Sequence, residues 1–223
     1  MRKLVLWGHR PVDYQLMFDL KEDDLKKPIL EFGCGPSAVN TSLPNVTSCD
    51  PLFVLDKDTL TAKSSLIFAD MLSEIEKEKN RFDFHSCGGL ERLVWQRKQG
   101  MNQFLADYEL GLEENRYVPA TELQLPFDHF QFEFALVSHY LFGLEDQDID
   151  FHVELLKELA RVAKDVRVFP LIDRYGKASD MLGPVLLHLQ QENYGTEVRD
   201  VAYPYQKDGN AMLRVWAHQC SVE

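Results

Sequence analysis

The sequence predicts an α/β fold in which a mostly parallel sheet ends in an antiparallel hairpin and contains a helical insertion. An apolar strand at residues 29–32 runs into the glycine turn Gly33-Cys-Gly35, and a second strand at 46–49 ends on Asp50. This order is typical of parallel α/β units. The segment Lys207-Asp-Gly-Asn210 is a strong hairpin-turn signal between the last two apolar runs. A long stretch of helical periodicity separates the second strand from the third.

Composition and charge indicate an ordinary soluble enzyme. The chain of 223 residues is long enough for one α/β domain with a sizeable core, and we expect a single domain over residues 1–223. Hydrophobic residues make up 45% and charged residues 27%, which excludes global disorder. The net charge of −12 repels nucleic-acid backbones and no basic patch offsets it, so no nucleic-acid partner is expected.

No segment predicts a membrane span, a leader or a metal centre. No apolar run approaches the ~20 residues of a transmembrane helix, and the N-terminal run is too short for a signal peptide. The cysteines lack the spacing of a zinc site or a disulfide framework; they are Cys34, Cys49, Cys87 and Cys220. We therefore expect a cytoplasmic protein without a metal or a membrane partner.

The first half of the chain predicts a helical preface at residues 1–27 and, after the second strand, a large insertion. About 65 residues separate Asp50 from the next strand at 116–120, where one crossover helix would suffice. Two amphipathic helices, at 64–79 and 90–110, account for most of that stretch. We expect residues 60–115 to form a helical cap.

Arg97 lies in the apolar stripe of the second insertion helix. A guanidinium on an apolar face either pairs with a buried carboxylate or reaches into a cavity. Two interpretations therefore stay open for Arg97, a structural ion pair and an anchor for a substrate.

The second half of the chain predicts the rest of the sheet. A strand at 132–138 ends at His139 and Tyr140, and Asp150 is the expected N-cap of the next helix. Gly195 is the expected stop of the last helix. The remaining elements are a helix at 151–163, a strand at 166–172, a helix at 181–193, and strands at 197–206 and 212–218.

The glycine turn and Asp50 together indicate a nucleotide-type cofactor site. Glycines let the backbone approach a ligand where a Cβ would collide, and a carboxylate at the tip of the next strand can accept hydrogen bonds from ribose hydroxyls. Dinucleotide-binding dehydrogenases typically have a third glycine before a long helix, whereas Pro36, Ser37 and Ala38 follow here. The glycine count and the terminal hairpin therefore disfavour NAD.

These features resemble the class I S-adenosylmethionine (SAM)-dependent methyltransferases. The resemblance includes Leu125-Pro-Phe127, the strand that follows it, and Arg161-Val-Ala163. The segments at 48–52 and 138–142 resemble a group of bacterial SAM-dependent methyltransferases whose substrate is unknown. The resemblance implies a Rossmann-like class I methyltransferase sheet and SAM as cofactor, and leaves the acceptor open.

The resemblance also implies which residues contact SAM: Glu31, Gly33, Gly35, Pro36, Asp50, Pro51, Leu52, Glu122 and Ser138. Asp50 would bind the ribose hydroxyls. Glu122 stands near the position where such enzymes often have an adenine-binding aspartate, so this chain departs from the common pattern there.

Methyl transfer requires alignment of acceptor, methyl group and sulfur, and a base only when the acceptor must lose a proton. His139 is the candidate base, because it follows a strand at the carboxyl edge of the sheet, although its ring could instead bond to neighbouring backbone. Tyr140 either walls an acceptor pocket or belongs to the core. The predicted function is methylation of a small molecule or a peptide; the alternative is a non-catalytic SAM-binding or partner protein.

Overall fold

A seven-stranded sheet forms the centre of the molecule, with the strand order β3-β2-β1-β4-β5-β7-β6. The computed structural model describes residues 7–119, 123–143, 147–173, 175–203, 205, 207 and 209–218. Strands β1 to β5 pair in parallel, whereas β7 runs antiparallel to both β5 and β6. The predicted fold class is confirmed. The strands are β1 (Ile29–Phe32), β2 (Val46–Cys49), β3 (Tyr117–Val118), β4 (Phe132–Ser138), β5 (Ala163–Phe169), β6 (Tyr194–Asp200) and β7 (Ala211–Ala217).

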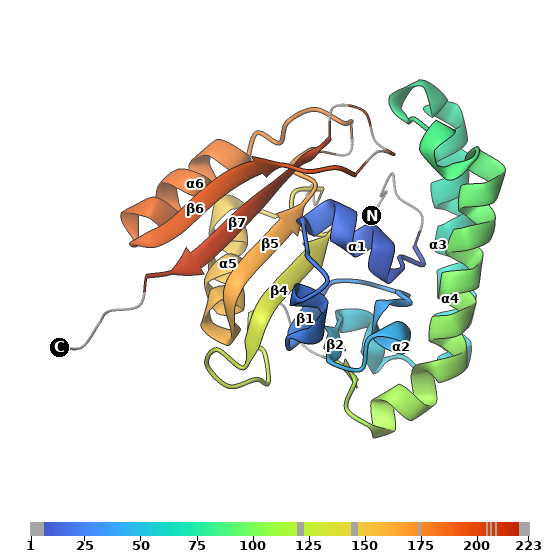
Figure 1. Ribbon diagram of the computed structural model, residues 1–223, viewed down its shortest axis with the longest axis horizontal. Coiled ribbons are helices and arrows are strands. Elements are labelled where there is room, and N and C mark those ends of the chain that lie inside the picture. Colours follow the sequence, from blue (N-terminus) through green and yellow to red (C-terminus); the bar gives the residue numbers. More distant parts are fainter. Residues whose placement is uncertain are drawn as a thin grey trace.

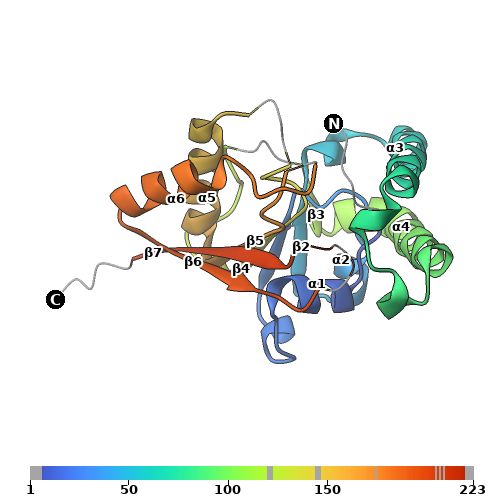
Figure 2. The same cartoon turned by 90° about the horizontal axis from the view of Figure 1, so that it is seen from above.

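Helices cover both faces of this sheet, and a helical pair stands beside the β2–β3 end (Figures 1 and 2). Helices α5 and α6 lie on one face and α1 on the other. No helix in the described part of the chain has the length and apolar character that a membrane span requires. The helices are α1 (Pro11–Phe18), α2 (Val39–Ser42), α3 (Lys57–Lys77), α4 (Leu90–Glu113), α5 (Ile149–Val162) and α6 (Leu182–Gln191).

Strand β1 is paired at both edges, with β2 and β4, and is buried on both faces because helices pack on each side of the sheet. Leu30 and Phe32 pack in the cluster formed with α5, while Ile29 packs in the cluster formed with α1. This alternation follows from the two-residue period of a strand. It also directs Glu31 toward the α1 face, where the carboxyl group is completely buried.

The long helices α3 and α4 occupy the stretch where the insertion was predicted. Helix α3 begins at Lys57 instead of 64 because Asp56 is its N-cap: Asp56 Oδ1 accepts a hydrogen bond from the backbone N–H of Thr59 at 2.9 Å. Lys57 Nζ reaches Glu109 at 2.9 Å, which aligns the start of α3 with the end of α4.

The predicted boundaries of two other helices were wrong for local reasons. Helix α5 begins at Ile149 because Asp148, not Asp150, caps it by accepting from the backbone N–H of Phe151 at 2.9 Å. Helix α6 ends at Gln191, and the left-handed residue that follows it is Asn193, with φ 64°. Gly195 instead lies inside β6, where a Cβ would stand 2.1 Å from the ring of Trp216.

The connection between β6 and β7 is longer than the predicted tight turn. The last paired residues are Asp200 and Ala211, so β6 ends well before 206, and the described residues between the two strands form a connecting loop. Its described part lies at the carboxyl edge of the parallel strands: the ring of Tyr203 packs edge-on against Phe169, the last residue of β5, at 5.2 Å.

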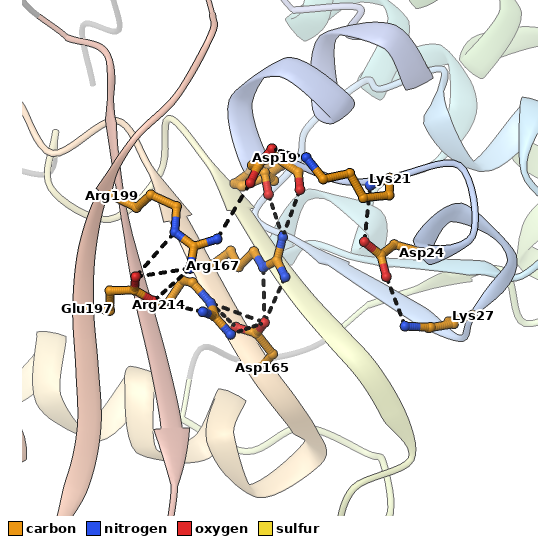
Figure 3. Close-up of polar contacts among 10 residues, drawn as sticks. Asp19, Lys21, Asp24, Lys27, Asp165, Arg167, Glu197, Arg199 and Arg214 are labelled. Carbon is orange, nitrogen blue, oxygen red and sulfur yellow. Dashed lines mark hydrogen bonds and ion pairs between the residues drawn. The ribbon is translucent and has the colours of Figure 1, made fainter.

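Charged side chains fasten the end of α1 to the sheet (Figure 3). Arg167 Nη1 donates to the carbonyl oxygen of Phe18 at 2.5 Å, and Arg167 Nη2 bonds Asp165 at 2.8 Å. Arg214 joins Asp165 at 2.9 Å to Glu197 at 2.7 Å. Because each charge has a partner of opposite sign, this network supports the fold and forms no basic patch.

The contact between α4 and the N-terminal segment generates a test of packing. A Cβ on Gly100 would lie 2.5 Å from the carbonyl oxygen of Gly8. Gly100→Ala should therefore lower the free energy of unfolding by about 1–3 kcal/mol, because backbone must shift to relieve the clash. Chemical denaturation measures this change.

The matched control is Gly183→Ala on α6, where a Cβ would meet nothing within 4 Å. There alanine should change stability by less than about 1 kcal/mol, because the gain from restricting the unfolded chain is opposed by Pro184, which disfavours helical backbone at a preceding residue that bears a Cβ. Equal stabilities of wild type and Gly100→Ala would contradict the close contact.

Candidate functional site

The glycine turn follows β1 at the carboxyl edge of the sheet. Gly33 and Gly35 have φ of 62° and 56°, in the left-handed region that favours glycine. A Cβ on Gly33 would stand 2.5 Å from the ring of Tyr140, and one on Gly35 would stand 2.9 Å from the indole of Trp7. The sequence predicts that a ligand lies against the backbone of these glycines. In the structure, aromatic rings of the chain itself lie against both of them.

Asp50 lies at the carboxyl end of β2 and holds the glycine turn. Its Oδ2 accepts from the backbone N–H of Gly35 at 2.7 Å, and its Oδ1 accepts from that of Leu52 at 2.8 Å. The side chain is nearly buried at 4% exposure. Asp50, Gly33 and Gly35 thus lie together as predicted, with Pro36 in the same turn and Pro51 beside Leu52. Contact of these residues with SAM stays a prediction.

Glu31 lies beneath the turn and faces protein on all sides. Ser37 Oγ donates to its carboxyl at 2.5 Å and Ser48 Oγ at 2.7 Å, so Glu31 links the turn to β2. Burial raises the pKa of Glu31 above its ordinary value, against the hydrogen bonds from Ser37, Tyr14 and Ser48. This geometry gives Glu31 a role in supporting the turn, and its predicted contact with SAM stays a prediction.

An N-terminal segment at residues 7–10, which we call the strap, crosses the same edge and was missed by sequence reasoning. The backbone N–H of Gly8 donates to Pro36 O at 2.9 Å, and the N–H of Ala38 donates to His9 O at 2.9 Å. Trp7 and His9 are buried, at 7% and 2% exposure. The strap is too short to show a periodic pattern, and no motif marks it.

His139 and Ser138 stand at the end of β4. The backbone N–H of His139 donates to Phe169 O at 2.6 Å, its φ is 51°, and its Nδ1 lies 2.9 Å from Ser138 Oγ. The ring stacks on His9 with centroids 5.5 Å apart and planes 13° from parallel. A left-handed histidine is uncommon and is held only where its surroundings fix it. The predicted base candidate therefore lies in an ordered aromatic setting at the edge where α/β proteins bind ligands.

Tyr140 packs inward. Its ring lies on Gly33 and meets Phe32 edge-on at 5.5 Å, with 9% of the residue exposed. These contacts agree with the core interpretation. The predicted role of Tyr140 as an acceptor-pocket wall stays a prediction.

Arg97 forms a buried ion pair with Asp13 of α1. Its two terminal nitrogens contact the Asp13 oxygens at 2.6 and 3.1 Å, and Nη2 also donates to the Tyr203 hydroxyl at 3.0 Å. Arg97 is 2% exposed and Asp13 is 0% exposed. These contacts agree with the structural ion pair. The role of Arg97 as an anchor for the acceptor stays a prediction. The predicted Glu122 lies outside the described residues.

The described residues offer no group of three or more His, Cys, Asp or Glu side chains that could hold a metal ion. Cys34, Cys49 and Cys87 are buried free thiols, and Cys220 lies outside the described part.

No known protein-family model matches the sequence. An uncharacterized protein of Methanocaldococcus jannaschii is 26% identical over 219 residues, which cover 96% of each chain.

Among solved structures, an O-methyltransferase of neocarzinostatin biosynthesis is similar with 12% identity and a TM-score of 0.46, over 89% of this chain and 51% of that one. The chain thus spans about half the length of that enzyme. A SAM-dependent methyltransferase from Aquifex aeolicus is 16% identical, with a TM-score of 0.41, over 91% of this chain and 90% of that one. One from Methanosarcina mazei is 13% identical, with a TM-score of 0.43, over 94% and 98%.

The buried ion pair gives a direct test of Arg97. Arg97→Met leaves the Asp13 carboxylate buried without its partner, which should lower the free energy of unfolding by about 3–5 kcal/mol. Thermal and chemical denaturation measure the loss. Arg92→Met, at an exposed arginine one turn earlier on α4, is the control and should change stability little.

The double variant Asp13→Leu/Arg97→Met should recover most of the loss, because it removes both buried charges together. An unchanged melting temperature in Arg97→Met would rule out the structural ion pair.

The raised pKa of Glu31 predicts a pH dependence of stability. In the unfolded chain this carboxyl loses its proton near its ordinary pKa of 4.5, while the folded protein retains the proton to higher pH. The unfolded state therefore binds fewer protons in that window, and the free energy of unfolding falls as pH rises from about 4.5 through the folded-state pKa. Glu31→Gln has no titrating carboxyl at this position, so its free energy of unfolding lacks this pH-dependent decrease.

The stability of Glu31→Gln relative to wild type should consequently increase with pH across that window, as denaturant melts at several pH values would show. The exposed Glu76→Gln on α3 is the control. A relative stability of Glu31→Gln that is flat or falls with pH would contradict the burial of a titrating carboxyl.

Proposed function

We propose that the protein is a SAM-dependent methyltransferase that acts on a small-molecule or peptide acceptor. The observation that supports this most directly is the pairing of the glycine turn after β1 with Asp50 after β2, joined by the 2.7 Å bond from Gly35 N–H to Asp50 Oδ2. The turn lies in a sheet whose order and antiparallel β7 match the architecture implied by the sequence resemblance. A cytoplasmic location and the bacterial grouping belong to the same proposal.

The residues of the turn fit a nucleoside cofactor in their chemistry. Asp50 accepts hydrogen bonds from backbone N–H groups at the tip of β2, and a carboxylate at this position is suited in its chemistry to receive ribose hydroxyls. Pro51 and Leu52 are half-buried beside it and provide apolar surface for a base. When bound, SAM supplies a methyl group activated by a sulfonium leaving group.

The chain's own residues then have the remaining tasks of positioning and proton removal. An acceptor atom aligned there would take the methyl group, and the electron pair of the broken carbon–sulfur bond would stay on sulfur. If that atom bears a proton, His139 is the base placed to accept it at the carboxyl edge of β4. Ser138, 2.9 Å from Nδ1, and the stacked His9 hold the plane of the His139 ring. The aromatic rings of Trp7 and Tyr140 exclude water from the turn.

Calorimetric titration with SAM, S-adenosylhomocysteine and NAD in parallel tests the cofactor. We expect micromolar binding of both sulfur compounds and none of NAD. Asp50→Ala should weaken SAM binding, since each lost charge-assisted hydrogen bond is worth about 1.5–3 kcal/mol. Asp70→Ala, at an exposed aspartate of α3, should bind SAM as wild type does.

Binding of NAD alone, or of none of the three compounds, would refute the proposal. SAM binding followed by failure of a broad acceptor screen would favour the alternative of a non-catalytic SAM-binding protein. Unchanged affinity in Asp50→Ala would place the ribose elsewhere.

A further inference from the structure

A cavity of about 650 Å³ opens at the tip of the insertion, away from the glycine turn. Residues 82–85 and 88–90, between α3 and the start of α4, form most of its lining. Lys207 of the β6–β7 loop completes the lining. The tip of the α3–α4 pair and this loop lie at the same end of the molecule (Figure 1). The volume falls in the range of small-molecule sites.

The walls of this cavity suit a flat ring. Phe82 and Phe84 stack with their planes 14° from parallel and centroids 5.6 Å apart. Gly88 and Gly89, with φ of 79° and 103°, belong to the same lining. A Cβ on Gly89 would meet nothing within 4 Å, whereas the Arg92 side chain lies against Gly88. Aromatic faces beside side-chain-free backbone accept a planar aromatic ligand with little steric cost.

The polar groups of the lining are held in fixed positions. Asp83 Oδ1 accepts from the backbone N–H of His85 at 3.0 Å, and the backbone N–H of Asp83 donates to Tyr205 O at 3.0 Å. Lys207 Nζ donates to Asn80 O at 3.1 Å. An ammonium has three donors, so this bond leaves Lys207 able to bind an anionic group on the ligand.

Two tyrosines separate the cavity from the strand-end histidine. Tyr205 packs edge-on against Tyr203 at 4.8 Å, and Tyr203 lies 6.3 Å from the His139 ring. A ligand in the cavity therefore occupies a second site at the same edge and does not compete for the glycine turn.

We propose that this cavity binds a small molecule with a planar aromatic ring and an anionic substituent. The ring lies against Phe82 and Phe84 beside the Gly88–Gly89 backbone, and the anionic group pairs with Lys207. The proposal does not depend on methyl transfer, because its site and its ligand are distinct from those of the cofactor.

Three probes with one ring system and different charge test the proposal: indole-3-acetate, the neutral indole-3-acetamide and the cationic tryptamine. Each is titrated into the full-length protein and followed by calorimetry and by protein NMR. Indole-3-acetate should bind saturably and at least about tenfold more tightly than the other two, a difference that corresponds to about 1.4 kcal/mol.

Two variants test separately the charge of Lys207 and the aromatic surface of Phe84. Lys207→Gln removes the charge but keeps a polar side chain, and should weaken indole-3-acetate to the affinity of the amide, while leaving the amide unchanged. Phe84→Ala should weaken all three probes. Lys63→Gln, at an exposed lysine of α3, is the matched control, and melting temperatures verify that each variant is folded.

The proposal is overturned if indole-3-acetate shows no saturable binding, if tryptamine binds as tightly, or if Lys207→Gln and Lys63→Gln have equal effects. SAM titrated into the same samples reports on the proposed function separately, so failure of one proposal is not mistaken for failure of the other.

Discussion

The arrangement of the carboxyl edge depends on one buried ion pair, between Arg97 of α4 and Asp13 of α1. Removing both charges from water is costly, and the paired geometry at 2.6 and 3.1 Å, with the Tyr203 hydroxyl as a further partner, offsets that cost. Asp13 also accepts from the backbone N–H of Arg10 at 2.9 Å. A single carboxylate therefore fixes where α1 begins, how the strap enters it, and how α4 and residue 203 lie against both.

At the glycine turn, the atoms that support the fold are the same atoms that we propose bind the cofactor. Asp50 bonds the backbone of Gly35 and Leu52, while Glu31 bonds Ser37 from below. A turn held on two sides by carboxylates is preorganised, so a ligand that binds there spends little free energy on ordering it. The same arrangement makes mutations at these positions change both stability and affinity, and the two effects must be measured separately.

The sequence predicted the features whose signals are local. The apolar run before Gly33, the acid at the tip of β2 and the strands around the terminal loop were found because each depends on a few neighbouring residues. Capping was harder, since Asp148 and Asp150 compete for the same helix start and only backbone geometry decides. Gly195 was misread because its reason is a contact with Trp216, which the chain order does not reveal.

The partners across long separations could not be predicted. Arg97 was recognised as an unusual residue, but nothing in the sequence identifies Asp13, 84 positions earlier, as its partner. The stacking of His9 on His139 and the packing of Gly8 against Gly100 also join residues that are far apart in the chain, so the sequence does not reveal them. Such contacts arise from the way the insertion and the end of β4 pack against the N-terminal strap and α1, which is a tertiary property.

The position of β7 has a consequence for how the protein is made. It is the last strand along the chain, yet it lies inside the sheet, between β5 and β6. During synthesis from the N-terminus, β6 has no strand to pair with until β7 has left the ribosome and bonded to β5. The sheet is therefore completed only after β7 has been synthesised, and until then the edge of β5 is exposed and open to pairing with other chains.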